Sequence, residues 1–174
     1  MAMKKFRILA ALMLFAGCAS MSQQKLTDRQ IAMVMRVANL GEVRESELAR
    51  TKAVDSGVRD FAAMMVTEHT AQNNKAEAEL AKANINSEDT DRSRQLDAAS
   101  GAAADRLRAL SGAALDRAYI DRSIDAHQSL IALIDSTLMP AVRKKVVRDQ
   151  LTDLRALAEK HLTRAKQIQA ALPR

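Results

Sequence analysis

Apolar residues recur in steps of three and four along most of the chain, the spacing that places them on one face of an α-helix. The pattern predicts five helical segments, at about residues 27–52, 58–84, 91–110, 120–138 and 147–172. Capping and breaking residues separate them: Thr27 with Gln30 fits a capping box at the first start, and Pro140 lacks the amide hydrogen that a helix interior needs. No stretch alternates like a β-strand, so the chain is predicted to be all-α.

The predicted helices form two hairpins, one from the first two main helices and one from the last two. Each hairpin brings polar residues to similar positions along the bundle axis. In an antiparallel pair, residues equally far along the chain from the turn lie side by side. Glu42 precedes the first turn by 14 residues and His69 follows it by 13, so both should lie roughly 20 Å from that turn at a rise of about 1.5 Å per residue. In the second hairpin, His127 and His161 reach one level only if the connecting loop extends to about Lys144.

The segment between the hairpins decides the connectivity. As a helix, residues 91–110 would span about 30 Å, enough to carry the chain back along the bundle before the next main helix begins. The predicted fold is therefore a ferritin-like four-helix bundle with an additional helix in the long connection between helices two and three. We expect this bundle to occupy residues 27–172.

The chain contains only three histidines, and each falls on the apolar stripe of a different predicted helix. They are His69, His127 and His161, and Glu42 lies on the stripe of a fourth helix. Three imidazoles with one carboxylate suit a single Zn, Cu or Ni ion. The four residues are therefore candidate ligands of one metal ion, provided that their side chains converge within about 5 Å.

The spacing around the histidines argues against a di-iron oxidase. Di-iron bundles carry Glu-x-x-His on two helices, so that both side chains bind the metals. The positions three before the histidines hold Val66, Ile124 and Ala158 instead. No catalytic residue is assigned, and the chain is not predicted to be an enzyme.

Buried histidines also occur as hydrogen-bonded core residues without any metal. Polar neighbours that could bond the imidazoles, or support them as metal ligands, are Asn39, Asp116 and Tyr119. In this alternative, the polar interior only fixes the register of the helices.

The first residues have the pattern of an export signal. Basic residues at positions 4, 5 and 7 precede a 9-residue apolar stretch, residues 8–16, which is too short for a membrane span of about 20 residues. Gly17 directly before Cys18, the only cysteine, resembles the bacterial lipoprotein signal, whose processing leaves a lipid on the cysteine. We therefore predict a signal peptide over residues 1–17 and a lipidated tether over residues 18–26.

The predicted anchor implies a location and changes the charge of the chain. Ala19, rather than Asp, follows Cys18, and by resemblance to bacterial sorting signals this favours the outer membrane, facing the periplasm. Removing residues 1–17 takes away three of the 27 basic residues and none of the 21 acidic ones, which lowers the formal net charge from +6 to +3. Only Phe61 and Tyr119 remain as aromatic residues, so no nucleic-acid surface is predicted. The predicted partner is the membrane, and no protein partner is indicated.

Several local motifs occur together at positions typical of one protein family. They are residues 38–42 (ANLGE), 48–53 (LARTKA), 61–70 (FAAMMVTEHT), 116–120 (DRAYI) and 161–162 (HL). In combination they resemble a bacterial domain-of-unknown-function family whose members are ferritin-like, usually exported and often labelled "predicted outer membrane protein". The resemblance covers about residues 31–168. It implies a fold and a location but no reaction.

Two functions follow as hypotheses. In the first, the chain is a lipid-anchored, periplasm-facing module that binds a metal ion through Glu42, His69, His127 and His161 during envelope stress. In the second, it is a structural or partner-binding bundle whose buried histidines are only hydrogen-bonded core residues.

Overall fold

The computed structural model describes residues 25–173; the predicted signal peptide, Cys18 and most of the predicted tether lie outside them. The described helices are α1 (Asp28–Lys52), α2 (Ser56–Lys82), α3 (Asp91–Arg108), α4 (Gly112–Leu133), the π-helical turn η1 (Ile134–Leu138), α5 (Met139–Ala141) and α6 (Lys145–Ala171). No strand occurs within these residues, which confirms the predicted all-α class. None of the described helices has both the length and the hydropathy of a membrane span.

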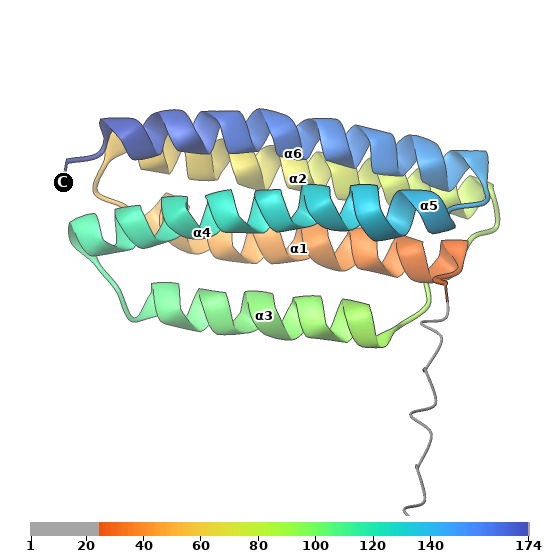
Figure 1. The fold of residues 1–174 in the computed structure, drawn as a ribbon. Helices are drawn as coiled ribbons and strands as arrows, with labels where there is room; N and C mark the ends of the chain where they lie inside the picture. Colours follow the sequence, from red (N-terminus) through yellow and green to blue (C-terminus); the bar gives the residue numbers. More distant parts are fainter. Residues whose placement is uncertain (1–24, 174) are drawn as a thin grey trace, which may run out of the picture.

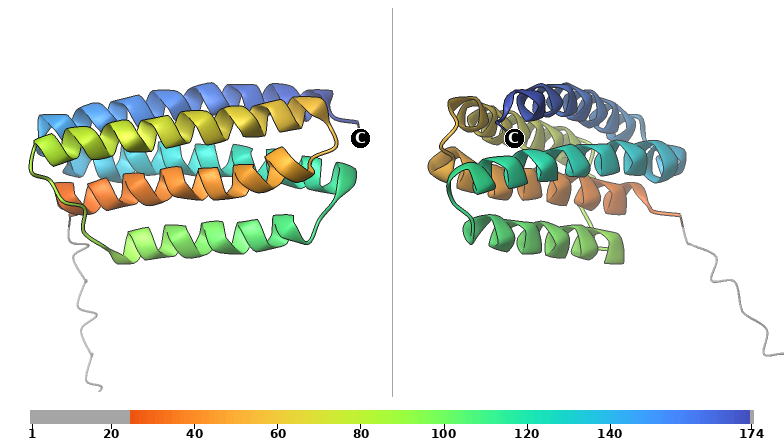
Figure 2. Two further views of the ribbon diagram at one scale, coloured as in Figure 1. Left: turned by 180° about the vertical axis from the view of Figure 1, so that it is seen from behind. Right: turned by 60° about the vertical axis from the view of Figure 1, so that its left-hand side comes forward.

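Four long helices form the bundle, and the fifth lies outside it. α1 and α2 make one antiparallel hairpin, and α4 and α6 make the other (Figures 1 and 2). α3 lies alongside α1, runs parallel to it and carries the chain back to the end where α4 begins. Each hairpin therefore contributes two helices to a common interior.

Local chemistry explains where α1 and α2 begin. Thr27 accepts a hydrogen bond from the amide of Gln30, and the Gln30 side chain accepts one from Thr27, so the predicted capping box is confirmed. Asp55 caps α2 by accepting from the amide of Val58. α2 therefore begins at Ser56, two residues before the start at about residue 58 that the apolar spacing predicted.

Pro140 was expected to end the helix before it, but the helix continues past this residue. Before the proline, the backbone widens into the π-helical turn η1, and α5 extends to Ala141. Proline has no amide hydrogen to donate to the backbone. The wider spacing of backbone hydrogen bonds in a π-turn lets the helix pass through Pro140 without that donor. α6 then starts at Lys145, so the loop does extend to Lys144, the condition under which His127 and His161 lie at one level.

The interior has two apolar regions. The Ile31 cluster, at the end where α1 begins, includes Ile31, Val34, Ile134, Leu138 and Leu151. The Phe61 cluster, at the end where α1 meets α2, includes Val58, Phe61, Leu115, Tyr119 and Ile120. Between them lies a polar layer, defined here as Asn39, Glu42, His69, His127 and His161, all of which are buried.

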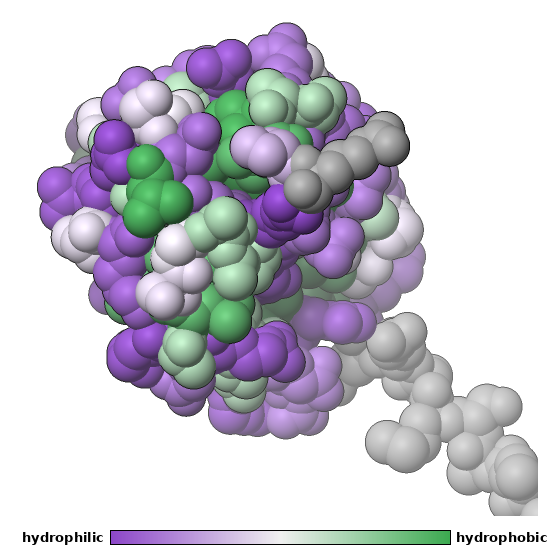
Figure 3. Space-filling model, turned by 90° about the vertical axis from the view of Figure 1, so that its left-hand side faces the viewer, coloured by the Kyte–Doolittle hydropathy of each residue, from purple (hydrophilic) through white to green (hydrophobic). Residues whose placement is uncertain are grey.

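The surface at the Phe61 end is mixed. Seen end-on, small apolar groups are interspersed with polar side chains (Figure 3). Val54, in the turn between α1 and α2, is 59% exposed. Most of the buried apolar residues of the described chain belong to the two clusters.

Candidate metal centre

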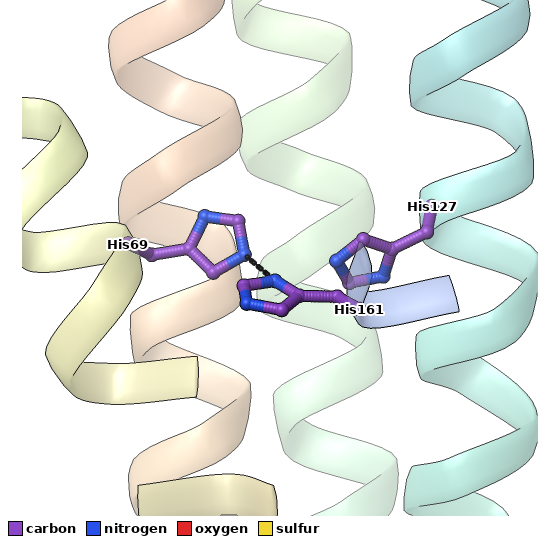
Figure 4. Close-up of side chains that lie close together, drawn as sticks. All are labelled: His69, His127 and His161. Carbon is purple, nitrogen blue, oxygen red and sulfur yellow. Dashed lines mark hydrogen bonds between the residues drawn. The ribbon is translucent and has the colours of Figure 1, made fainter. Parts of the chain in front are cut away.

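The three histidines meet in the centre of the bundle. His69 comes from α2, His127 from α4 and His161 from α6, and their rings face one another (Figure 4). One ligand nitrogen from each ring lies within 4.8 Å of the other two. The ring centroids are 4.9 to 5.7 Å apart, and all three side chains are completely buried.

Each ring has one nitrogen bonded to a group outside the cluster. His69 Nδ1 lies 2.9 Å from Asn39 Oδ1, and His127 Nδ1 lies 2.7 Å from the carbonyl oxygen of Ser123. His161 Nε2 lies 2.9 Å from a carboxylate oxygen of Glu68. All three outer partners are hydrogen-bond acceptors, the arrangement that holds metal-bound histidines in one tautomer and orientation.

The outer acceptors determine what the inner nitrogens offer. A neutral imidazole carries one hydrogen, so donation to Ser123 leaves the Nε2 lone pair of His127 facing inward. That Nε2 is buried and has no hydrogen-bond partner among the described residues. Donation to Glu68 likewise leaves a lone pair on His161 Nδ1, which lies 3.1 Å from His69 Nε2.

The short contact between His69 and His161 needs a hydrogen or a cation. If His69 Nδ1 donates to Asn39 and His161 Nε2 donates to Glu68, neither inner nitrogen carries a hydrogen, although they lie at hydrogen-bonding distance. Rotation of the Asn39 amide by 180° would let His69 Nε2 donate to His161 Nδ1. A metal ion between the inner lone pairs would resolve the same conflict and would also give His127 Nε2 a partner.

Burial keeps two of the imidazoles neutral. Burial, supported by the nearby His161 and His127, lowers the pKa of His69 well below its ordinary value. Burial lowers the pKa of His161 to about 4, although the hydrogen bond with Glu68 acts in the opposite direction. Since metal ligation requires the neutral imidazole, both rings are ready to bind a metal at neutral pH.

Glu42 lies near this cluster but is not one of the converging groups. The set of side chains whose ligand atoms all lie within 4.8 Å contains the three histidines alone. The Glu42 carboxylate is close enough to His127 for the two to interact electrostatically. Burial raises the pKa of Glu42, and the opposing attraction to His127 is smaller.

The three expected supporting residues have different partners. Asn39 bonds His69, as described above. Asp116 accepts hydrogen bonds from the backbone amides of Val54 and Asp55 and thus holds the α1–α2 turn. The Tyr119 hydroxyl bonds Ser46, 2.8 Å away. Of the three, only Asn39 therefore hydrogen bonds a histidine.

Glu68 is a residue of the site that the sequence did not predict. Neighbouring residues of a helix point about 100° apart, so the apolar stripe that carries His69 does not include Glu68. The structure places Glu68 at the contact between α2 and α6, where it bonds both His161 and Lys160. Burial raises the pKa of Glu68, but the bonds from Lys160 and His161 outweigh it and lower the pKa overall. The adjacent pair Lys160-His161 on the facing helix was the available signal.

Comparison with known proteins identifies the family. The model described as "Domain of unknown function (DUF4142)" matches residues 16–168 of this chain, including all three histidines. The chain belongs to the DUF4142 family. Membership of a domain-of-unknown-function family, expected from the sequence motifs, is confirmed. No curated protein matches this DUF4142 chain significantly.

A solved structure shares the fold of this DUF4142 protein. It is the crystal structure of a candidate secreted protein, described as DUF305, from Streptomyces coelicolor. The similarity covers 83% of this chain and 92% of that one, with a TM-score of 0.68 and 15% sequence identity. At this identity the likeness shows a common helical fold.

Proposed function

We propose that this DUF4142 protein is a cell-envelope module that binds one transition-metal ion through His69, His127 and His161. The observation that carries the proposal is the inward convergence of three buried imidazole nitrogens whose opposite ring nitrogens are bonded to acceptors. Such outer bonds fix the tautomer in which a histidine binds a metal. His127 Nε2, buried without a partner, supports it further, because buried polar atoms normally have one.

One of the separations between the inner nitrogens matches the geometry of a single bound ion. In tetrahedral zinc sites the Zn–N distance is about 2.0–2.1 Å, which places neighbouring ligand nitrogens about 3.3 Å apart. His69 Nε2 and His161 Nδ1 are 3.1 Å apart. An all-imidazole set favours Zn, Cu or Ni over Mg and Ca, which prefer oxygen ligands.

Acidic groups compensate the charge of a bound cation. Glu68 bonds one of the ligand rings directly, and Glu42 interacts electrostatically with another. We propose that Glu68 orients His161 and that Glu42 lies beyond the ligand set. Glu42 would therefore contribute to affinity through its charge and not through a metal bond.

The envelope location is part of the same proposal. The basic and apolar pattern of residues 4–16 supports export, and Gly17-Cys18 supports a lipid anchor at Cys18 in the outer membrane. The structural neighbour is itself described as a candidate secreted protein.

A second function is favoured by one specific contact. His69 and His161 hydrogen bond each other at 3.1 Å when one inner nitrogen carries a hydrogen, and this needs no metal. In that case the histidines would only link α2 to α6, and the bundle would serve as a structural or partner-binding module. Metal binding separates the two functions.

The test is metal-dependent stability. Protein with Cys18→Ser, which removes the only thiol ligand, is stripped with chelator and melted with and without Zn²⁺, Cu²⁺ or Ni²⁺. A ligand present at 100 times its Kd adds about 2.7 kcal/mol to the free energy of unfolding, which shifts Tm by roughly 5–10 °C for a chain of this size. The matched variant, His69→Gln with His161→Gln, should lose this shift.

A spectroscopic measurement on the wild-type protein keeps the test valid even if the double variant fails to fold. Bound Cu²⁺ should show nitrogen hyperfine couplings in its electron paramagnetic resonance spectrum, which a structural role would not produce. If none of the three ions raises the Tm of the stripped protein, the metal-binding function is rejected and the structural function is retained.

A further inference from the structure

A separate cavity lies between α1, α3 and α4. It has a volume of about 300 Å³, at the lower end of the range for small-molecule sites. Aliphatic side chains form most of its wall, among them Val37, Leu96, Leu130 and Leu133. Exposed Ala99 and Ser129 also line it, so the cavity reaches the surface beside α3.

Two polar side chains in the wall have no partner among the described residues. Glu42 is only 8% exposed, and its carboxylate takes part in no hydrogen bond or ion pair with the described residues. Ser100 is 5% exposed, and its hydroxyl oxygen is buried without a hydrogen-bond partner. Buried polar groups usually have hydrogen-bond partners, because leaving them unpaired costs free energy. A ligand that hydrogen bonds both groups would remove that cost.

The tight approach of α3 to α1 fixes Ser100 in this wall. A Cβ atom on Gly41 would lie 2.9 Å from the Ser100 hydroxyl oxygen, closer than real side chains pack. Glycine at position 41 therefore allows the two helices to approach at the level of Glu42. Both unpaired groups line the same cavity.

The charged side chains around Glu42 in the cavity wall favour a cationic ligand. Glu45 is paired with Arg122 through two hydrogen bonds of 2.9 and 3.0 Å, so these two charges offset each other. Glu42 has no such direct pairing, although His127 and Arg122 attract its charge. Arg92 also lines the cavity, but it lies eight residues before Ser100, about 12 Å along the helix axis, and forms no ion pair with Glu42.

We propose that this cavity binds a small aliphatic amine, with its ammonium group against Glu42 and Ser100 and its hydrocarbon chain along the apolar wall. The volume admits a molecule of roughly ten heavy atoms, since a water in the liquid occupies about 30 Å³. An ammonium group supplies several hydrogen-bond donors, which suit a carboxylate and a hydroxyl oxygen. The proposal does not depend on a metal at the histidines.

The test compares three probes of equal length in the presence of a chelator, so that metal binding is excluded. n-Hexylamine, n-hexanol and n-hexanoate are titrated into the protein by calorimetry. We expect the amine to bind at least tenfold more tightly than the alcohol and the acid to bind most weakly. Glu42→Gln, which keeps the size of the side chain, should lower amine affinity at least tenfold and alcohol affinity less than threefold.

A cavity-filling variant provides the matched control. Ala99→Phe adds bulk to the wall on α3, far in sequence from the histidines, and should weaken both amine and alcohol while leaving any metal-induced Tm shift intact. Equal binding of amine and alcohol, an unchanged amine affinity in Glu42→Gln, or no binding of any probe at millimolar concentration would each overturn the proposal. In the last case the cavity holds water only. None of these outcomes bears on the metal site.

Discussion

The two apolar clusters and the polar layer between them are equally buried but differ in what they contribute. In the Ile31 and Phe61 clusters, side chains such as Leu151 and Ile120 gain stability simply by leaving water. In the polar layer, burial imposes a cost that is offset only where a partner is present, and His127 Nε2 has none. The clusters therefore account for the stability of the bundle, whereas the polar layer is the region for which we propose a binding function.

The largest predicted loss follows from shortening a side chain in the Ile31 cluster. Leu151 is completely buried, so Leu151→Ala removes apolar contacts and leaves a cavity. We expect the free energy of unfolding to fall by about 2–5 kcal/mol in chemical denaturation. Leu40→Ala is the matched control, because Leu40 is 42% exposed, and its change should stay within about 0.5 kcal/mol. Equal losses in the two variants would contradict the assignment of stability to the cluster.

A second prediction concerns acid and the polar layer. The unfolded chain protonates its histidines below about pH 6.5, whereas the folded protein protonates His161 only near pH 4, where burial has placed its pKa. The unfolded state therefore binds more protons between these values, and the stability of metal-free protein falls as the pH drops from about 6.5 to 4. For His161 the loss is about 3 kcal/mol, and the lowered pKa of His69 acts in the same direction.

The control for the acid experiment is His161→Gln. Glu42, whose pKa burial raises, titrates in the opposite sense, and the lowered pKa of Glu68 matters below its ordinary value of 4.5. The difference between wild type and variant from pH 6.5 to 4.5, measured by denaturation with chelator present, isolates the histidine. An equally steep loss in the variant would show that His161 is not its source and would leave His69, whose lowered pKa acts in the same direction.

The sequence predicted most of the fold because helix periodicity and caps are local. The apolar stripes predicted the five long helices, and the capping box of Thr27 with Gln30 predicted where the first helix begins. Local sequence signals could not predict that the helix continues through Pro140. The π-turn before the proline is a change in the backbone, and it packs against α6.

The site was predicted less completely than the fold. Position on a stripe identified the three histidines, because their side chains point into the core. It could not identify Glu68, whose contact with His161 depends on how α2 and α6 face each other. Nor could it separate Glu42 from the three converging histidines, because a stripe and a height do not determine which way a long side chain extends.

The smallest predicted change in stability comes from the polar layer itself. His127→Leu replaces a ring with an unpartnered buried nitrogen by an apolar side chain of similar size, at the loss of one hydrogen bond to Ser123. With chelator present, we expect the free energy of unfolding to change by no more than about 1 kcal/mol, because replacing a buried polar group by a packed apolar one is often neutral. The same variant should lose the metal-induced rise in Tm, whereas Leu151→Ala should keep it despite its lower stability. A loss of several kcal/mol in metal-free His127→Leu would show that the histidine stabilises the bundle directly, and the distinction between the polar layer and the apolar clusters would then fail.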